Sequence, residues 1–346
     1  MTSASAGLPL AVTMGDPAGI GGEITCKAWT ARHQQALPPF FLIDDPDRIA
    51  ALARASNLDV PVRAIAHAGQ AVSAFATALP VLAHPLSAPV VPGKANPANG
   101  KAIITSIDRA VQLVQAGQAA AVVTNPIHKH SLYEAGFRAP GHTEYLAELA
   151  GGNLRPVMML ASPALRVVPV TVHVSLARAI ATLTTDAIVT DAEITANALR
   201  ADFGIDHPRL AIAGLNPHAG EEGSLGDEEE GIIAPAVTRL RGKGIDAIGP
   251  LAPDAMFHEE ARAKYDAAIC MYHDQALIPL KTLAFWEGIN VTLGLPFVRT
   301  SPDHGVAFDL AGTGKARPES LIAAIRAAAD FATRRRALDD RRRDVA

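Results

Sequence analysis

The chain has 346 residues, of which 49% are apolar and 19% are charged, and its formal net charge is −4. This length exceeds the size at which one hydrophobic core usually stops growing, so we expect two domains or two lobes. The charge balance is unsuited to a nucleic-acid backbone, and we expect no nucleic-acid partner. No segment approaches the roughly 20 apolar residues that span a bilayer, and the N-terminus lacks a signal-peptide pattern. We therefore expect a cytoplasmic protein without a membrane partner.

Short apolar runs bounded by glycine and proline predict strands. In chain order these runs are LPLAVTM (8–14), PFFLID (39–44), AAAVVTNP (119–126), PVMMLAS (156–162), LRVVPVTVHV (165–174), RLAIAGLNP (209–217) and DAAICMYHD (266–274). Most are too apolar to have one face in water, which is typical of sheets that helices cover on both sides.

Two longer segments have helical periodicity. In 99–117, Ile107 and Val111 share one face with Ile104 and Val114, and Gly117 is suited to end the helix. The same pattern predicts a helix over 319–336. Strands that alternate with helices predict an α/β fold.

Three other features of the chain are an irregular segment, a charged C-terminal run and two cysteines. The proline-rich sequence of residues 82–100 predicts an irregular surface segment before a helix. The closing run RRRALDDRRR (334–343) indicates a solvated helix end, with a binding tail as the alternative. Cys26 and Cys270 are the two cysteines, and we expect both to be reduced thiols, with Cys270 in the core.

The first predicted strand runs into GDPAGIGGE, where four glycines lie within residues 15–22. Glycines free the backbone for tight turns and for close approach to a ligand or another strand. The segment is not the dinucleotide motif GxGxxG, and a purely structural strand-to-helix turn explains it equally well.

Three of the twelve histidines follow different predicted strands. His173, His218 and His273 stand at strand ends, where ligands bind in open α/β sheets. Neutral imidazoles are suited to a divalent ion that keeps one position open for substrate, although a lone histidine at such a place is more often structural. Asp274, beside His273, is a candidate to orient that ligand.

A second set of residues is cationic and rich in amides. His142 and Thr143 follow Gly141 at the start of a predicted helix, where backbone N–H groups bind anions; Thr143 as a simple helix cap is the alternative. Downstream, Lys281, Asn290 and Arg299 form a set suited to phosphate, with three unrelated surface residues as the alternative reading.

Long motifs along nearly the whole chain resemble the 4-hydroxythreonine-4-phosphate dehydrogenase (PdxA) family of pyridoxal phosphate biosynthesis. They are MGDPAGIGGEI, TNPIHK, GHTEYLA, GLNPHAGEEGSLGDEE, YHDQALIPLK and NVTLGLPFVRTSPDHG. The resemblance implies that His173, His218 and His273 hold one divalent ion per site, with zinc expected first and magnesium or cobalt as alternatives. It also implies that the phosphorylated substrate is bound by His142, Thr143, Lys281, Asn290 and Arg299, with Asp254 and Asp274 as further polar contacts. Asp274 is the candidate catalytic base because it is adjacent to His273.

The family is similar in fold to the isocitrate and isopropylmalate dehydrogenases, which hold NAD largely through a late loop. The resemblance implies two α/β lobes, 1–137 with 308–346 and 138–307, around an active-site cleft. It implies NAD as the cofactor, with NADP as an alternative, at His304, Gly305, Asp309, Gly312 and Gly314. Two positions depart from the family pattern: Gly22 replaces a usual proline, and Val306 replaces a usual threonine.

The implied reaction is oxidation of 4-phosphooxy-L-threonine at C3, followed by loss of carbon dioxide, in a homodimer whose two subunits share each site. In that dimer, His273 of one subunit approaches the ion held by His173 and His218 of the other. An alternative is a related dehydrogenase of another 4-phosphorylated hydroxy acid, of the erythronate or threonate type, or of a dihydrodiol dicarboxylate. A non-catalytic binding protein is a further alternative, but it needs neither the histidines nor the phosphate set.

Overall fold

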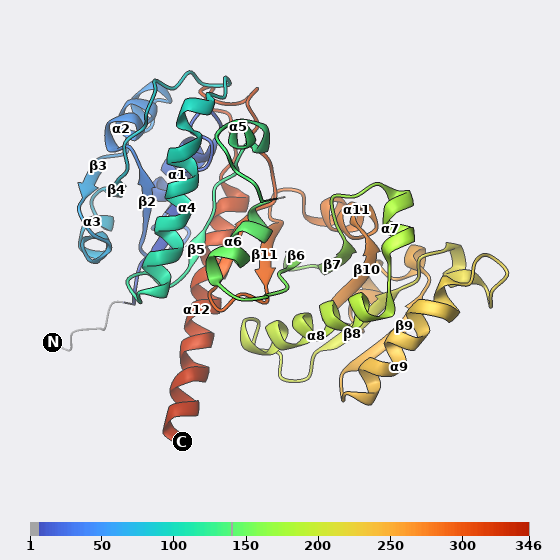
Figure 1. The fold of residues 1–346 in the computed structure, drawn as a ribbon. Helices are drawn as coiled ribbons and strands as arrows, with labels where there is room; N and C mark the ends of the chain where they lie inside the picture. The colour runs from blue at the N-terminus through green and yellow to red at the C-terminus, as the bar shows by residue number, and fades with distance from the viewer. Residues whose placement is uncertain (1–6, 140, 346) are drawn as a thin grey trace. The chain divides into compact units, whose positions relative to one another are not determined.

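The chain forms two compact units, seen in a computed structural model that describes residues 7–139 and 141–345 (Figure 1). The first unit comprises Met1–Leu154 and Leu295–Thr333, and the second comprises Arg155–Gly294 and Arg334–Ala346. Each unit contains strands together with helices, which confirms the predicted α/β class.

The first unit contains a parallel sheet in the strand order β3-β4-β2-β1-β5-β12. Its elements are β1 (Leu10–Thr13), α1 (Gly21–Thr30), β2 (Phe40–Asp44), α2 (Pro46–Ala55), β3 (Val62–Ile65), α3 (Ala71–Phe75), β4 (Leu79–Ala83), α4 (Gly100–Gln115), β5 (Val122–Val123), α5 (Lys129–Glu134), α6 (His142–Ala150), β12 (Arg299–Pro302) and α12 (Glu319–Val345). Because the strands are parallel, their carboxyl ends meet at one edge of the sheet.

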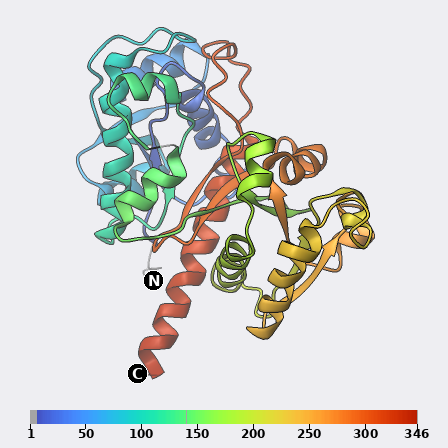
Figure 2. The same ribbon diagram turned by 45° about the vertical axis from the view of Figure 1, so that its right-hand side comes forward.

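Helices cover both faces of this sheet (Figure 2). Residues of α3, α4 and α6, including Ala71, Ile107 and Leu146, join one buried cluster with the strand residues Phe41 and Ile43. Helices α1 and α2 pack against each other elsewhere in the unit. This packing explains why β1 and β2 are almost entirely apolar and fully buried.

The second unit contains a mixed sheet in the strand order β11-β6-β7-β10-β8-β9. Its elements are β6 (Val157–Ala161), β7 (Arg166–Thr171), α7 (Leu176–Thr182), α8 (Thr185–Ala201), β8 (Arg209–Ala213), α9 (Ala234–Gly242), β9 (Asp246–Leu251), α10 (Glu259–Arg262), β10 (Ala267–Tyr272), α11 (His273–Ala284) and β11 (Ile289–Leu293). Strands β7, β10, β8 and β9 are parallel, and β6 pairs antiparallel with both β7 and β11. The four parallel strands bring their carboxyl ends to one edge.

The unit boundaries differ from those expected from the sequence, because residues 138–154 and 295–307 belong to the first unit. Helix α6 stays there because Leu146 and Ala147 pack into the same core as Ile107 of α4. Strand β12 stays there because it pairs with β5. The last turns of α12 belong to the second unit, where Arg335 forms an ion pair with Asp202.

Each strand predicted from an apolar run is present, and both predicted helices are found as α4 and α12. Gly117 has a φ of 67° just after α4, as expected of a residue that ends a helix. Cys26 and Cys270 are free thiols and fully buried, as predicted. Among the residues that the structure describes, no helix is long and apolar enough to cross a membrane.

Candidate active site

Three neighbouring strands of the second unit end at the predicted metal ligands. His173 follows β7, His273 is the first residue of α11 directly after β10, and His218 lies in the 3-10 turn Pro217–Gly220 after β8. The rings of His173 and His273 lie 5.8 Å apart between centroids. Within the described part of the chain, no three histidine, cysteine or acidic side chains are grouped so as to hold a metal ion. One chain thus brings His173 and His273 together without completing a ligand set.

Two of these histidines have unusual backbone conformations. His173 has a φ of 54° and His218 a φ of 53°, and Ala219, Glu221 and Glu222 are also left-handed. For residues other than glycine, a sparsely populated conformation costs about 1–3 kcal/mol and persists only where the surroundings enforce it. Such residues gather at functional sites, which supports a role for both strand ends.

Buried hydrogen bonds enforce the turn that carries His218. Glu229 is 3% exposed, and its Oε1 accepts hydrogen bonds from the backbone N–H groups of Leu215 and Asn216, each at 2.7 Å. The side-chain amide of Asn216 donates to Glu229 Oε2 at 2.9 Å and to Glu228 Oε2 at 2.7 Å. Glu229 thus holds the entry to the turn before His218.

A second buried side chain joins the His218 and His273 strand ends. Gln275 donates from Nε2 to the carbonyl of Gly214 at 2.8 Å, and its Oε1 accepts from the N–H of Met271 at 2.6 Å. Sequence reasoning assigned no role to Gln275 or Glu229. Both stand inside the family-like strings YHDQ and GDEE, which is the signal that could have identified them.

The acidic candidates differ in their contacts. Asp274 Oδ1 lies 2.7 Å from His273 Nδ1, a contact that orients the imidazole and leaves Nε2 to face a ligand. This geometry supports an orienting role for Asp274 and gives no direct support to its role as a base. Asp254 is exposed in the short turn Pro253–Ala255 after β9.

The predicted phosphate residues are divided between the units. Lys281 lies in α11 of the second unit, where its ammonium sits 5.5 Å from the centroid of the Phe285 ring. Asn290 lies in β11 of the same unit, opposite Leu160. Arg299, His142 and Thr143 belong to the first unit.

Within the first unit, the buried Arg299 influences the ionisation of His142. Arg299 is 3% exposed and donates to Thr124 Oγ1 from Nε at 3.2 Å and from Nη2 at 2.6 Å. Burial lowers the pKa of Arg299 to about 10, so the guanidinium stays charged at neutral pH. Burial, Arg299 and Lys129 together lower the pKa of His142 well below its usual value, so its imidazole is neutral. Sequence reasoning assigned no role to Thr124 or Lys129, although both stand inside the family-like string TNPIHK.

The glycine-rich turn of the first unit packs against strand β5. Gly15 has a φ of 69°, and a Cβ there would lie 2.7 Å from both Asn125 Cβ and the Pro126 carbonyl oxygen. Gly22 stands where the family usually has proline, and a Cβ at this position would lie 2.7 Å from Leu52 Cδ2. The positive φ and the backbone contact therefore require glycine at Gly15, whereas at Gly22 the close atom is the end of the Leu52 side chain, which can shift.

The late loop expected to hold the cofactor lies against this turn. The N–H of Ile20 donates to the carbonyl of Val306, so the contact uses the backbone and needs no threonine hydroxyl. Lys27 donates to the carbonyls of Gly314 and Ala316 at 2.8 and 2.6 Å and pairs with Glu23. Gly312 and Gly314 have φ values of 74° and 73°, whereas Gly305 and Asp309 are exposed and His304 Nδ1 lies 3.0 Å from the Gly305 carbonyl oxygen.

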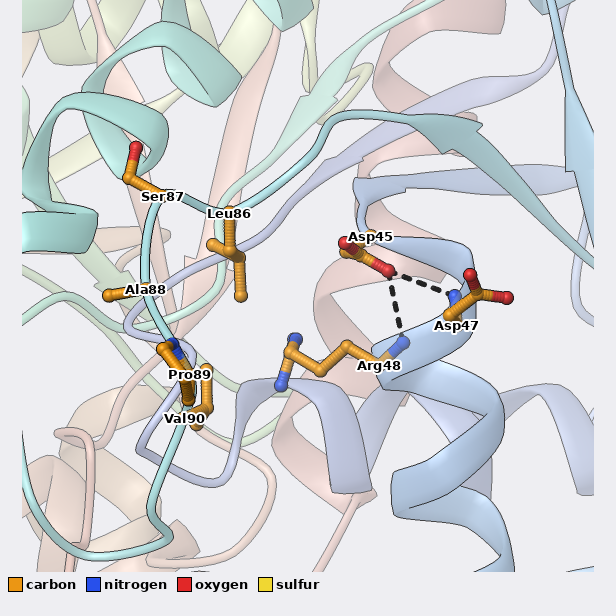
Figure 3. Close-up of a pocket in the computed structure, with 8 residues that line it drawn as sticks. All are labelled: Asp45, Asp47, Arg48, Leu86, Ser87, Ala88, Pro89 and Val90. Carbon is orange, nitrogen blue, oxygen red and sulfur yellow. Dashed lines mark hydrogen bonds between the residues drawn. The ribbon is translucent and has the colours of Figure 1, made fainter.

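A cavity of about 420 Å³ opens where β2 and β4 end (Figure 3). It is lined by Asp45, Asp47, Arg48 and residues 86–90. Asp45 accepts hydrogen bonds from the first N–H groups of α2, and Arg48 donates to the Pro17 carbonyl of the glycine-rich turn. None of the site residues predicted from the sequence is among those lining this cavity, so the chemistry is expected elsewhere.

Comparisons with known proteins agree along the chain. The model of the family described as "Pyridoxal phosphate biosynthetic protein PdxA" matches residues 36–328. The 4-hydroxythreonine-4-phosphate dehydrogenase of Bradyrhizobium diazoefficiens is 55% identical over 335 residues, which cover 94% of this chain and 97% of the relative. The enzyme of the same name from Caulobacter vibrioides is 54% identical over 94% of this chain and 98% of its own.

Solved structures of related dehydrogenases are also similar to this chain. The crystal structure of 4-hydroxythreonine-4-phosphate dehydrogenase from Klebsiella pneumoniae has a TM-score of 0.83 and 39% identity, covering 94% of this chain and 99% of the other. A terephthalate 1,2-cis-dihydrodiol dehydrogenase from Burkholderia xenovorans has a TM-score of 0.62 and 30% identity, over 94% of this chain and 98% of the other.

Proposed function

Because the chain belongs to the PdxA family of pyridoxal phosphate biosynthetic proteins, we propose that it oxidises 4-phosphooxy-L-threonine at C3 with NAD as hydride acceptor. The C3 alcohol loses a hydride to NAD and a proton to the medium. The product, 2-amino-3-oxo-4-phosphooxybutanoate, is a β-keto acid that loses carbon dioxide and becomes 3-amino-2-oxopropyl phosphate on the route to pyridoxal 5′-phosphate. The observation that carries this proposal is 55% identity to a dehydrogenase of this name over 94% of the chain.

The arrangement around Arg299 supports a phosphorylated substrate. A buried guanidinium binds phosphate by its planar fork, and burial strengthens the attraction because water screens it less. The neutral imidazole of His142 beside it adds a group that can donate or accept a hydrogen bond. We propose that Thr143, Lys281, Asn290 and Asp254 contact the same substrate.

The strand-end histidines fit a divalent ion. His173 and His218 are held in strained conformations, and Asp274 orients His273, as carboxylates commonly orient metal-bound imidazoles. We propose that His173, His218 and His273 hold one ion, with zinc first on ligand type and magnesium or cobalt as alternatives. When bound, such an ion lowers the pKa of a coordinated hydroxyl and polarises a carbonyl.

The late loop is the proposed cofactor site. His304, Gly305, Asp309, Gly312 and Gly314 belong to it, and its attachment to α1 through Lys27 and Glu23 supports a rigid backbone there. Its contact with the glycine-rich turn after β1 adds backbone that can approach a ligand closely. We propose NAD as the cofactor, with NADP as the alternative.

The proposed metal site needs ligands from two copies of this chain. Among its described residues, one chain does not gather three ligands. A homodimer in which His273 of one subunit serves His173 and His218 of the other combines all three in one site. We propose such a dimer, with two shared sites. The cytoplasmic location expected from the sequence is part of the same proposal.

A substrate panel tests the function. NADH formation is followed with 4-phosphooxy-L-threonine, a 4-phosphorylated erythronate, a 4-phosphorylated threonate and a cis-dihydrodiol of terephthalate. We expect kcat/KM for 4-phosphooxy-L-threonine to exceed each of the others by about 100-fold, a gap that corresponds to about 2.7 kcal/mol. The dihydrodiol is included because one structural relative acts on such a compound by name. A higher kcat/KM for any other substrate would replace the proposed one.

A further inference from the structure

Lys129 covers the start of helix α6. It is the first residue of α5, and its Nζ and Cε lie 3.4 and 3.6 Å from the point where a Cβ on Gly141 would stand. Gly141 is the N-cap of α6 and provides no side-chain hydrogen bond to the helix. The absence of a side chain at Gly141 therefore lets the Lys129 ammonium approach the first turn of α6.

Several positive groups converge on this turn. The first N–H groups of a helix lack partners within the helix and carry the positive end of its dipole. Arg299 and Lys129 both lower the pKa of His142, the first residue of α6, so two positive charges act on this helix end. The Nε2 atom of His142 is shielded from solvent and makes no hydrogen bond. Positive groups that are close together and shielded from water are stabilised by an anion bound between them.

A negative group, Glu144, lies in the same turn of α6. Its Oε2 lies 2.9 Å from the same point on Gly141. Among the residues that the structure describes, however, Lys129 and Glu144 form no ion pair. The competing explanation is that Lys129 neutralises the charge of Glu144 and binds no ligand. The two explanations predict different effects when the Glu144 carboxylate is removed.

We propose that Lys129 binds the phosphate group of the substrate together with Arg299 and the first turn of α6, an inference that rests on the function proposed above. Phosphate accepts several hydrogen bonds at once: Arg299 offers a planar fork, Lys129 a mobile point charge, and α6 its backbone N–H groups. All these groups belong to the first unit, so this part of the phosphate site is built within one unit.

Titration with inorganic phosphate tests the proposal without any turnover. The imidazole resonance of His142, assigned by its loss in His142→Gln, reports binding in histidine-labelled protein. We expect Lys129→Gln to weaken phosphate binding by about 10- to 100-fold, the range for a lost hydrogen bond to a charged group. Lys129→Arg should restore most of the affinity, and Lys101→Gln, at an exposed lysine of α4, should leave it unchanged.

Glu144→Gln separates the two explanations. If Lys129 binds phosphate, this variant should bind inorganic phosphate at least as tightly as the native protein, because a repelling carboxylate is gone. Equal losses in Glu144→Gln and Lys129→Gln would overturn the proposal in favour of a structural ion pair. An unchanged affinity in Lys129→Gln would overturn it directly.

Kinetics then relate Lys129 to the substrate. Lys129→Gln should lower kcat/KM for 4-phosphooxy-L-threonine but not for 4-hydroxy-L-threonine, which lacks the phosphate. Equal losses for both compounds would contradict the proposal. If neither compound is oxidised by the native protein while Lys129 still controls phosphate binding, the proposed function fails and the role of Lys129 in binding phosphate stands.

Discussion

Arg299 is the residue on which recognition of the phosphate depends most. It is 3% exposed and fixed to Thr124 by two hydrogen bonds, so its position is set before any ligand arrives. We expect Arg299→Ala to lower kcat/KM for 4-phosphooxy-L-threonine by about 100-fold, at the upper end for hydrogen bonds to charged groups. The Kd for NAD should change by less than about threefold, a difference of less than 0.7 kcal/mol.

Arg54→Ala, at an exposed arginine of α2, is the matched control for this change and should alter neither quantity. Circular dichroism of both variants checks that the fold is intact. Equal losses for substrate and NAD in Arg299→Ala would contradict the assignment of this residue to phosphate.

Asp16 is a buried carboxyl group whose ionisation opposes folding. It is 2% exposed, its Oδ1 accepts from the N–H of Ala18, and its Oδ2 has no hydrogen-bond partner. Burial raises its pKa, although Ala18, His128 and Arg48 act in the opposite direction. Because the folded pKa lies above the unfolded one, about 3.9, the contribution of Asp16 to stability is complete below that pH. It is lost as the pH rises through the folded pKa.

We therefore expect Asp16→Asn to raise Tm at pH 8, since the amide keeps an acceptor for Ala18 and carries no charge. The gain should shrink as the pH falls toward 4. Thermal denaturation across this range, with the exposed Asp59→Asn as control, measures the effect. A lower Tm for Asp16→Asn at pH 8 would show that the carboxylate is stabilised in the folded protein.

At the scale of elements, the turn between β8 and His218 depends on Glu229. This carboxylate accepts from two backbone N–H groups and from the Asn216 amide, and it thereby holds the strained turn. We expect Glu229→Gln to weaken Zn²⁺ binding by about 10- to 100-fold, as is typical for residues that orient metal ligands. Calorimetric titration measures this, with the neighbouring exposed Glu230→Gln as control. Native Zn²⁺ affinity in Glu229→Gln would contradict a positioning role.

The elements differ in how clearly the sequence predicts them. Strands β1, β2 and β10 are uninterrupted apolar runs, because both faces of each are covered, and such runs are recognisable without a structure. Strand β3 escaped prediction because its two central residues are exposed and its pattern is weak. Strand β9 escaped because it contains Gly249 and Pro250, which usually indicate a turn.

The site residues also differ in how clearly the sequence predicts them. Histidines at strand ends can be found from sequence, because a strand end is a local property. The role of Thr124 cannot, since it depends on the pairing of β5 with β12, which brings residues 175 positions apart together. Glu229 and Lys129 stand inside the family-like strings GDEE and TNPIHK, but a single acidic or basic residue does not by itself reveal what it contacts in the fold.

At the scale of the whole molecule, the rings of His173 and His273 lie 5.8 Å apart, and the described residues of one chain form no complete metal site. We propose that each site takes His273 from the partner. Mixing the inactive variants His173→Ala and His273→Ala should then restore about one quarter of native activity, because about half the dimers are hybrids with one complete site each.

His173→Ala mixed with His218→Ala is the control, since no hybrid of these two variants contains a complete site. Mass spectrometry of the mixtures establishes that subunits have exchanged. Exchange without recovered activity in the first mixture would reject the proposal that His273 comes from the partner.

The central claim is that the chain oxidises 4-phosphooxy-L-threonine and that its product loses carbon dioxide. The most direct measurement follows NADH absorbance and released carbon dioxide together, with purified protein, NAD, a divalent salt and this substrate. The account predicts one carbon dioxide for each NADH formed, both abolished when the substrate is omitted. No NADH above the background without protein, under conditions where the protein is folded and loaded with metal, would contradict it.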